Sequence, residues 1–251
     1  QIQSQPAAPP VIEFVDDGVS LPDEATFARL AQTDSPTFLE MCMRRYRREV
    51  HTVSGEMHKQ ERIAGKLYPE EAIDFWFREE PYSVLIKWKQ GARQACASMY
   101  VEGENGNKVL ALPTLLRWSG KLLERDPDCC EAKAASRYSL RESSLLQGTE
   151  RTWQAWKTAR DNGTLHVEYK GIVAVPELGG RRCHVLKRTC ETPEGDGVAT
   201  VEIAVDAQTW LQTGSTLTDK CGNLIGKYMF PQVVVNPEFS PTLFTKDSVR
   251  K

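Results

Sequence analysis

Residues 73–88 read IDFWFREEPYSVLIKW. Apolar side chains occupy every second position before the segment 79–81, and the same alternation resumes after it. A period of two is typical of strands that bury one face, and a proline between two such runs indicates a turn. The stretch therefore predicts an antiparallel hairpin formed by residues 73–78 and 82–88.

Alternating runs continue on both sides of this hairpin. A second hairpin is expected over residues 95–101 and 109–111, because the intervening Asn105-Gly106 pair favours a tight turn. Further strand-like runs lie at residues 165–169, 182–190, 199–205, 210–218 and 224–235. Connections this short join antiparallel strands, so we expect a mainly β fold of the α+β class with about nine or ten strands.

Three segments have helical signals instead. Residues 20–24 combine a capping serine, an early proline and first-turn acids, which predicts a short helix. From Ser35 to Val50 apolar side chains recur every four residues, and a third helix is expected over residues 143–161. Residues 115–123 fit either a helix or a strand, and the sequence leaves both open.

The composition is that of an ordinary globular protein. Hydrophobic residues make up 40% and charged residues 26% of the chain, with a formal net charge of -2. This balance provides no overall positive field, so no nucleic-acid partner is expected. No stretch approaches the roughly 20 consecutive apolar residues that a membrane-spanning helix needs.

The beginning of the chain has the composition of a linker. Residues 1–10 are rich in Gln, Ala and Pro and resemble a tether exposed after removal of a signal peptide, which predicts a periplasmic or otherwise exported protein. An engineered truncation would look the same. We expect residues 1–34 to form this tether and the short helix, and residues 35–251 to form a single domain.

Seven cysteines are present, without any Cys-x-x-Cys motif. Cys129 and Cys130 are adjacent, and Cys183 and Cys190 lie on either arm of one strand-like run. Ordinary packing, or structural bridges in an oxidising compartment, explains these positions. We therefore expect neither a metal site nor a redox function.

Motifs of known enzyme classes are missing from the sequence. The histidines are His51, His58, His166 and His184, and none has a recognisable metal-ligand spacing. The sequence has no Gly-x-Ser-x-Gly nucleophile elbow and no glycine-rich phosphate loop. We therefore expect no enzyme and no cofactor, with a hydrolase assembled from distant residues as the least favoured alternative.

One helix face is strongly basic. It carries Arg44, Arg45, Arg47 and Arg48 in the last turns of the helix that begins at Ser35. A solvated face explains such a cluster, and the alternative is a patch that contacts anionic lipid head groups. Two acidic pairs and two histidines are also expected to face solvent: Asp16-Asp17, Glu79-Glu80, His58 and His184.

Two short motifs resemble a known family. Residues 61–67 read ERIAGKL and residues 77–84 read FREEPYSV. They resemble an uncharacterised bacterial envelope family, a domain of unknown function, whose fold is similar to the LolA and LolB periplasmic lipoprotein carriers. Later segments agree in their order: Asp126-Pro127, Arg137-Tyr138 with Glu142, residues 205–211, and Asn236-Pro237 with Phe239 and Phe244. The resemblance spans about residues 35–247, and it departs at Gln212, where proline is expected.

The resemblance implies a strongly curved antiparallel sheet that forms a half-open barrel, with helices covering its concave side. It also implies that this side holds an apolar ligand, a lipid or a lipoprotein acyl chain, without catalysis. A strongly curved sheet leaves interior space unless helices fill it. A structural or protein-interaction module with a filled core is therefore the alternative.

The candidate ligand-contacting residues are apolar side chains of one sheet face and two tryptophans of the long helix. They are Phe75, Phe77, Tyr82, Val84, Trp88, Trp153 and Trp156. Packing in a dry core is the competing explanation for all of them. Arg78 and Arg137 stand at positions that the resemblance marks, and we expect them to contact a head group or carboxylate. A salt bridge with Glu142 or another acid is the alternative for each arginine.

Overall fold

The structure is a computed structural model that describes residues 14–250. The Gln/Ala/Pro-rich part of the expected tether, residues 1–13, lies outside the described residues. Among the described residues, no helix combines the length and apolar character that crossing a membrane requires.

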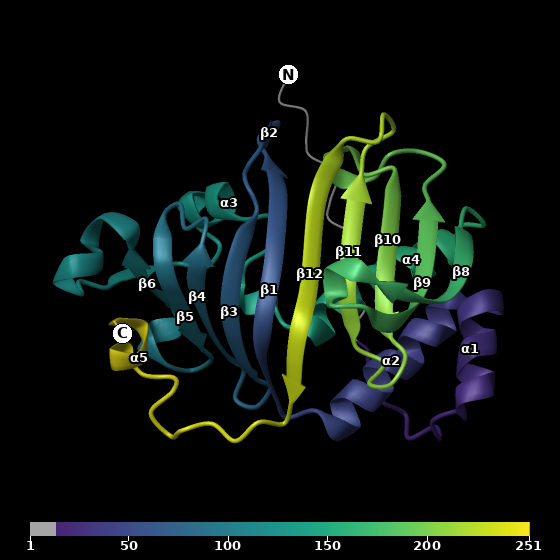
Figure 1. Cartoon of the computed structure of the whole chain (residues 1–251), viewed down its shortest axis with the longest axis horizontal. Helices are drawn as coiled ribbons and strands as arrows, with labels where there is room; N and C mark the ends of the chain where they lie inside the picture. The colour runs from purple at the N-terminus through teal and green to yellow at the C-terminus, as the bar shows by residue number, and fades with distance from the viewer. Residues whose placement is uncertain (1–13, 251) are drawn as a thin grey trace.

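Twelve strands form one antiparallel sheet (Figure 1). Their order across the sheet is β7-β6-β5-β4-β3-β1-β12-β11-β10-β9-β8, with β2 paired to β1. The strands are β1 Thr52–Ile63, β2 Lys66–Leu67, β3 Glu71–Arg78, β4 Ser83–Gln90, β5 Ala95–Val101, β6 Val109–Pro113, β7 Leu123–Arg125, β8 His166–Val175, β9 Arg181–Thr189, β10 Thr200–Asp206, β11 Gln212–Thr218 and β12 Leu224–Val235. Since the edge strands β7 and β8 do not pair with each other, the curved sheet is an open half-barrel. The predicted fold class is confirmed.

The hairpin predicted from residues 73–88 is present as β3 and β4. Phe77 pairs with Val84, Phe75 with Ile86 and Ile73 with Trp88 across β3 and β4. The sequence predicts fewer strands than the twelve in the sheet. The strands β2 and β7 have only two and three residues, which are too few to show a periodic pattern.

The two halves of the sheet meet at β1 and β12, which are the central strands in Figure 1. This pairing joins residues far apart in the sequence, such as Val53 and Val235. Gly55 allows the strands to approach closely, because a Cβ atom there would lie 1.8 Å from the backbone oxygen of Gln232. The register shifts just beyond this point, between Glu56 and His58.

Five α-helices accompany the sheet in the described part of the chain: α1 Glu24–Thr33, α2 Ser35–Glu49, α3 Cys130–Ala135, α4 Leu145–Asp161 and α5 Lys246–Arg250. Asp23 caps α1 and Asp34 caps α2 through their side chains, and Ser144 forms a capping box with Gln147 at the start of α4. Each of the three predicted helices is present, but the expected start of the first was wrong, because α1 begins at Glu24 and its cap is Asp23 rather than Ser20. Residues 115–123, which fitted either a helix or a strand, contain both: a 3-10 helix η2 at Thr114–Ser119 is followed by the strand β7.

Helices α1, α2 and α4 cover the inner face of the β8–β11 half of the sheet. Phe27, Phe38 and Trp156 pack there against Leu186 and Ile203. The outer face is covered differently, because Phe244 and Val249 of the C-terminal segment pack on apolar residues of β4, β5 and β6. Figure 1 shows α5 beside these strands at the end of the chain.

His184 was expected to face solvent, and this expectation is wrong. The side chain is only 3% exposed, with its ring centroid 5.3 Å from Phe27 and 5.5 Å from Phe38. Its Nδ1 lies 2.9 Å from the hydroxyl oxygen of Tyr169. The alternating pattern of β9 identified a strand there, but not that helices cover its inner face.

The acidic pairs were also expected to be solvated, and both have internal partners. Asp16 accepts two hydrogen bonds from Arg48, at 2.6 and 2.7 Å, and Arg44 pairs with Asp17. Glu79 accepts a 2.6 Å hydrogen bond from the Tyr46 hydroxyl, and burial raises the pKa of this carboxyl.

The basic face of α2 is consequently engaged within the chain. Arg44 is only 6% exposed, Arg47 pairs with Glu150 at 2.5 Å, and Arg45 pairs with Glu49 at 2.9 Å. These pairs do not favour a patch that is free to contact lipid head groups.

All seven cysteines are free thiols, and burial raises the pKa of Cys183 to about 11. Ordinary packing therefore explains Cys183 and Cys190, both of which are buried.

Candidate ligand-binding site

A cavity of about 590 Å³ lies between the inner face of the sheet and the segment that contains α3 and α4. This volume falls within the range of small-molecule sites in proteins. The interior of the half-barrel is therefore not filled by its own side chains.

The wall of the cavity is largely apolar. Strands from both halves of the sheet supply it, since residues of β1, β3, β4, β6, β10, β11 and β12 all contribute. Its main apolar members are Met57, Ile73, Phe77, Ile86, Trp88, Val109, Val201, Leu217 and Phe230. Leu145, Ala155 and Trp156 of α4 close the cavity from the opposite side. The period-two pattern explains the strand contribution, because alternate side chains share one face.

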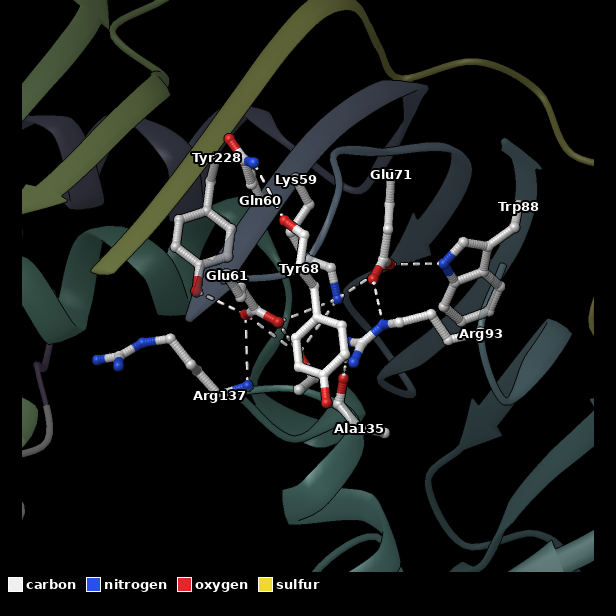
Figure 2. Close-up of polar contacts among 11 residues, drawn as sticks. Lys59, Gln60, Glu61, Tyr68, Glu71, Trp88, Arg93, Ala135, Arg137 and Tyr228 are labelled. Carbon is white, nitrogen blue, oxygen red and sulfur yellow. Dashed lines mark hydrogen bonds and ion pairs between the residues drawn. The ribbon is translucent and has the colours of Figure 1, made fainter. Parts of the chain in front are cut away.

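A buried polar cluster lies at one wall of this cavity (Figure 2). It consists of Lys59, Glu61, Glu71, Arg93, Ser136 and Tyr228. Lys59, Glu61 and Glu71 are each less than one tenth exposed. The two carboxylates balance the ammonium and the guanidinium, so the formal charges of the cluster cancel.

Every carboxylate in the cluster has several donors. The Nζ of Lys59 lies 3.3 Å from both Glu61 and Glu71. Glu71 also accepts hydrogen bonds from Trp88 Nε1 at 2.7 Å and Arg93 Nε at 3.1 Å. Since buried charges are costly without partners, this arrangement allows Lys59, Glu71 and Arg93 to line an apolar space, with Glu61 behind them.

Tyr228 completes the cluster from β12. Its hydroxyl donates a 2.6 Å hydrogen bond to Glu61, which also accepts a 3.3 Å bond from the backbone N–H of Arg137. Burial, together with the negative charge of Glu61, raises the pKa of Tyr228 well above its usual value. The phenol therefore stays protonated at neutral pH and acts as a donor to Glu61.

Four buried polar atoms of the cavity lining have no hydrogen-bond partner among the described residues. They are Nε of Arg137, Nε1 of Trp156, Nε of Arg188 and Oε1 of Gln212. Buried polar groups are nearly always paired, and unpaired ones in a cavity mark positions where a ligand or water completes the hydrogen bonding. The cavity therefore has an apolar wall and a few unsatisfied polar positions.

The structure places the predicted site residues in two groups. Phe77, Trp88, Trp156 and Arg137 line the cavity. The others lie outside its lining: Phe75, Tyr82, Val84, Trp153 and Arg78. The first group is therefore in a position to contact a ligand in the cavity.

Local packing explains why the second group is outside the lining. The Phe75 ring stacks on Phe77 and covers Gly55, where the sheet has no side chain. Trp153 donates a 3.0 Å hydrogen bond to Glu40 of α2. Arg78 donates to Ser83 at 2.8 Å, and its guanidinium lies over the Phe244 ring.

Several lining residues were missed by sequence reasoning, namely Lys59, Glu71, Arg93, Arg188, Gln212 and Tyr228. A signal existed for Glu71, which precedes Ile73 by two positions and therefore points to the same face of β3. Gln212 was noted only as a departure from an expected proline. Its side chain donates a 3.2 Å hydrogen bond to Thr152 of α4.

Metal-binding groups are not found in the part of the chain that the structure describes, where no cluster of three or more His, Cys, Asp or Glu could hold an ion.

The fold and the site together define the class of protein, an open antiparallel half-barrel with helices that enclose an apolar cavity. The chain belongs to a family of proteins of unknown function, DUF1571, whose model matches residues 50–249. The predicted membership of an uncharacterised family is confirmed. No curated protein matches the chain.

Several solved structures are similar to this chain at low identity. A chain of the Pseudomonas aeruginosa MucA/MucB complex is 14% identical with a TM-score of 0.49, over 84% of this chain and 60% of that chain. This protein thus spans less than two thirds of that relative. An uncharacterized conserved protein from Thermus thermophilus is 9% identical with a TM-score of 0.48, over 84% of this chain and 93% of that chain. The LolA superfamily protein NE2245 from Nitrosomonas europaea is 7% identical with a TM-score of 0.30, over 92% of this chain and 99% of that chain.

Proposed function

We propose that this protein binds an acyl chain of a lipid or lipoprotein in the cavity and carries it without chemical change. The observation that supports this proposal most directly is the apolar cavity of about 590 Å³ between the sheet and α4. Each CH₂ group removed from water contributes about 0.8 kcal/mol, so part of one acyl chain is enough for useful affinity.

The chemistry of the polar cluster favours binding over catalysis. Glu71 is held by three donors, and Glu61 by Lys59, Ser136 and Tyr228. A general base needs a carboxylate that is free to accept a proton from substrate. Groups so fully engaged fit a structural role, in which they hold β1, β3 and β12 against the segment after α3.

The experiment is a displacement assay with an environment-sensitive naphthylamine dye. The dye should gain fluorescence on binding to the protein and lose it when a fatty acid is added. Ala155→Trp places a large ring into the cavity from α4 and should abolish the signal. Ala174→Trp is the matched control, since Ala174 is exposed on β8 and outside the lining.

Native mass spectrometry of protein purified from cells provides an independent readout. A bound lipid should be found on the wild-type chain and be absent from Ala155→Trp. A dark dye together with lipid-free wild-type protein would exclude the carrier function and favour a protein-interaction module.

We also propose that the carrier acts outside the cytoplasm, in the periplasm or exported further. The resemblance of residues 61–67 and 77–84 to an envelope family supports this location. Fractionation of cells that express the natural full-length protein should recover it with periplasmic markers, and recovery with cytosolic markers would contradict the proposal.

A further inference from the structure

Two arginines of the cavity lining have the same unusual environment. Arg188 of β9 is only 2% exposed, and Arg137 follows α3 with a side chain that is 12% exposed. In each of them the guanidinium Nε is buried without a partner among the described residues. Both line the cavity, so each presents an unsatisfied donor and a positive charge next to the apolar space.

The two arginines are paired with acids of a single connection, residues 190–199 between β9 and β10. Glu194 forms a bidentate pair with Arg188, in which NH1 of Arg188 lies 3.1 Å from Oε2 of Glu194. Asp196 lies 3.0 Å from NH1 of Arg137. This connection therefore covers the arginine end of the cavity, where Glu194 and Gly195 are themselves part of the lining.

The acids differ from the arginines in their exposure to solvent. The Asp196 side chain is 72% exposed and that of Glu194 is 41% exposed, while the guanidinium groups are buried. Ion pairs with an exposed partner are weak, because water competes for the carboxylate. An anion that enters from the cavity side would meet the guanidinium groups in a drier environment, where charge-assisted hydrogen bonds are stronger.

Other charged groups near the arginines do not neutralise them. Glu61 is near Arg137, but it accepts a hydrogen bond from the backbone N–H of Arg137 and not from its guanidinium. The charge of Glu61 is balanced by Lys59. The guanidinium of Arg151 lies over the Tyr138 ring at 4.0 Å and adds a further positive charge to the same part of the lining.

We propose that Arg137 and Arg188 form a subsite for the anionic head group, a carboxylate or phosphate, of a single-chain or multi-chain lipid whose tail occupies the apolar cavity. The head group takes the place of Asp196 and Glu194, and the 190–199 connection moves away from the arginines. This inference rests on the proposed lipid-carrier function and specifies the charge of the ligand.

The experiment compares three ligands with the same saturated tail: palmitate, hexadecyl phosphate and hexadecanol. Titration calorimetry with the wild-type chain should show both acids binding at least about tenfold more tightly than the alcohol, because only the acids form charge-assisted bonds. The ratio between the two acids distinguishes a carboxylate head group from a phosphate.

Variants then test the arginines directly. Arg188→Gln and Arg137→Gln should weaken binding of the acids by about tenfold and leave hexadecanol unchanged. Arg182→Gln is the matched control, since Arg182 is an exposed residue of the same strand. The double variant Glu194→Gln/Asp196→Asn should bind the acids more tightly than wild type, because the competing internal carboxylates are gone. This double variant changes exposed side chains only and keeps the test valid if an arginine variant fails to fold.

The outcomes separate the two proposals. Equal affinities for acids and alcohol in the wild type and in every variant would overturn the anionic subsite and leave the carrier function standing. Absence of binding by all three ligands would overturn the carrier function itself.

A second inference comes from a different part of the surface. The 3-10 helix η2 projects beyond β6 at the edge of the sheet (Figure 1). Leu115 is 94% exposed there and Trp118 is 96% exposed. Large apolar side chains exposed together at the tip of a projecting segment are typical of interaction sites.

Basic residues surround this apolar tip. Arg117, Lys121 and Arg125 are all exposed there, against two exposed acids, Glu124 and Asp126. Residues 109–113 before the tip and 123–127 after it include members of the cavity lining. Tryptophan and leucine beside cations match the interface of an anionic bilayer, where the ring lies at the level of the head groups.

We infer that Leu115 and Trp118 insert into the surface of an anionic membrane, next to the β6–β7 side of the cavity. Sedimentation with vesicles should show binding to phosphatidylglycerol–phosphatidylcholine mixtures that weakens with salt, and little binding to phosphatidylcholine alone. Leu115→Ser/Trp118→Ser should abolish binding, and Arg117→Gln/Lys121→Gln should weaken it. Val234→Ser is the control, since Val234 is an exposed apolar residue of β12.

Unchanged vesicle binding by Leu115→Ser/Trp118→Ser would overturn this inference. So would a shift from dimer to monomer in sedimentation velocity without any effect on vesicles, because the tip would then contact a second copy of the chain.

Discussion

The indole Nε1 of Trp88 donates a 2.7 Å hydrogen bond to Oε2 of Glu71, and this contact joins the apolar wall of the cavity to the buried polar cluster. Both residues line the cavity. The ring supplies apolar surface for a ligand, while its N–H helps to stabilise a buried negative charge. The stability of the half-barrel and the shape of its cavity are therefore coupled at this pair.

Glu71→Gln should lower the free energy of unfolding by about 3 kcal/mol. The substitution removes the charge that Lys59 and Arg93 share and leaves the buried Lys59 and the half-buried Arg93 with one carboxylate, that of Glu61. Urea unfolding followed by tryptophan fluorescence measures the change. Glu70→Gln is the control, because Glu70 is exposed and its loss should change stability by less than about 0.5 kcal/mol. Equal stability of Glu71→Gln and Glu70→Gln would contradict the role given to the cluster.

Gly55→Ala should destabilise the protein by about 1 to 3 kcal/mol. The new Cβ would lie 1.8 Å from the backbone oxygen of Gln232, so β1 and β12 would have to separate at the junction of the two halves. Thermal and urea unfolding both report this change. Gly148→Ala in α4 provides a control of opposite sign, because its nearest atom would be 3.8 Å away and alanine favours a helix by about 1 kcal/mol. A neutral Gly55→Ala would show that the two strands are not held at this distance.

The protein should lose stability as the pH falls below about 6.5, and His184 should account for part of the loss. Burial lowers the pKa of His184 below its usual value of 6.5, so the unfolded chain takes up a proton there before the folded protein does. Stability from this group is complete above the unfolded pKa and decreases as the pH falls toward the folded pKa. Urea unfolding at pH 5 to 7.5, a range in which histidine titrates, should therefore show a smaller pH dependence for His184→Gln than for the wild type.

Glu79 contributes to the pH dependence of stability with the opposite sign. The effect of His184 therefore has to be measured as the difference between the wild type and His184→Gln. Burial raises the pKa of Glu79 above 4.5, so its contribution to stability decreases as the pH rises through the folded pKa. The substitution His184→Gln leaves the contribution of Glu79 unchanged. Identical pH profiles of His184→Gln and the wild type would mean that His184 titrates alike in the folded and unfolded chains.

Arg44→Gln should release the segment of residues 14–19 from α2. The Arg44 side chain contacts Asp16 and Asp17, and its guanidinium lies 5.4 Å from the centroid of the Phe14 ring. Faster hydrogen exchange of the backbone amides in this segment is the expected result, with exchange in β3 unchanged as the internal control. Unaltered exchange in the segment would assign its order to other contacts, such as Phe14 with Trp153.

The periodic parts of the fold could be predicted from the sequence. The β3–β4 hairpin follows from side chains that alternate over residues 73–88, and α4 follows from apolar positions that recur along one side of a helix. Short elements such as β2 escaped prediction because two residues contain no period. The expectation for His184 failed for a related reason, since a strand pattern does not identify the helices that pack on it.

Local pattern thus determined the antiparallel strands, the three longer helices and the apolar character of the inner face. Tertiary structure alone decided where the interior stays empty, since Phe75 and Phe77 share one strand face and yet only Phe77 lines the cavity. It also decided which charges meet, because Arg137, which follows α3, and Arg188 of β9 come to the same space from separate segments of the chain. The physical reason is that backbone periodicity depends on neighbours in sequence, whereas burial and ion pairing depend on distances that only the closed fold brings about.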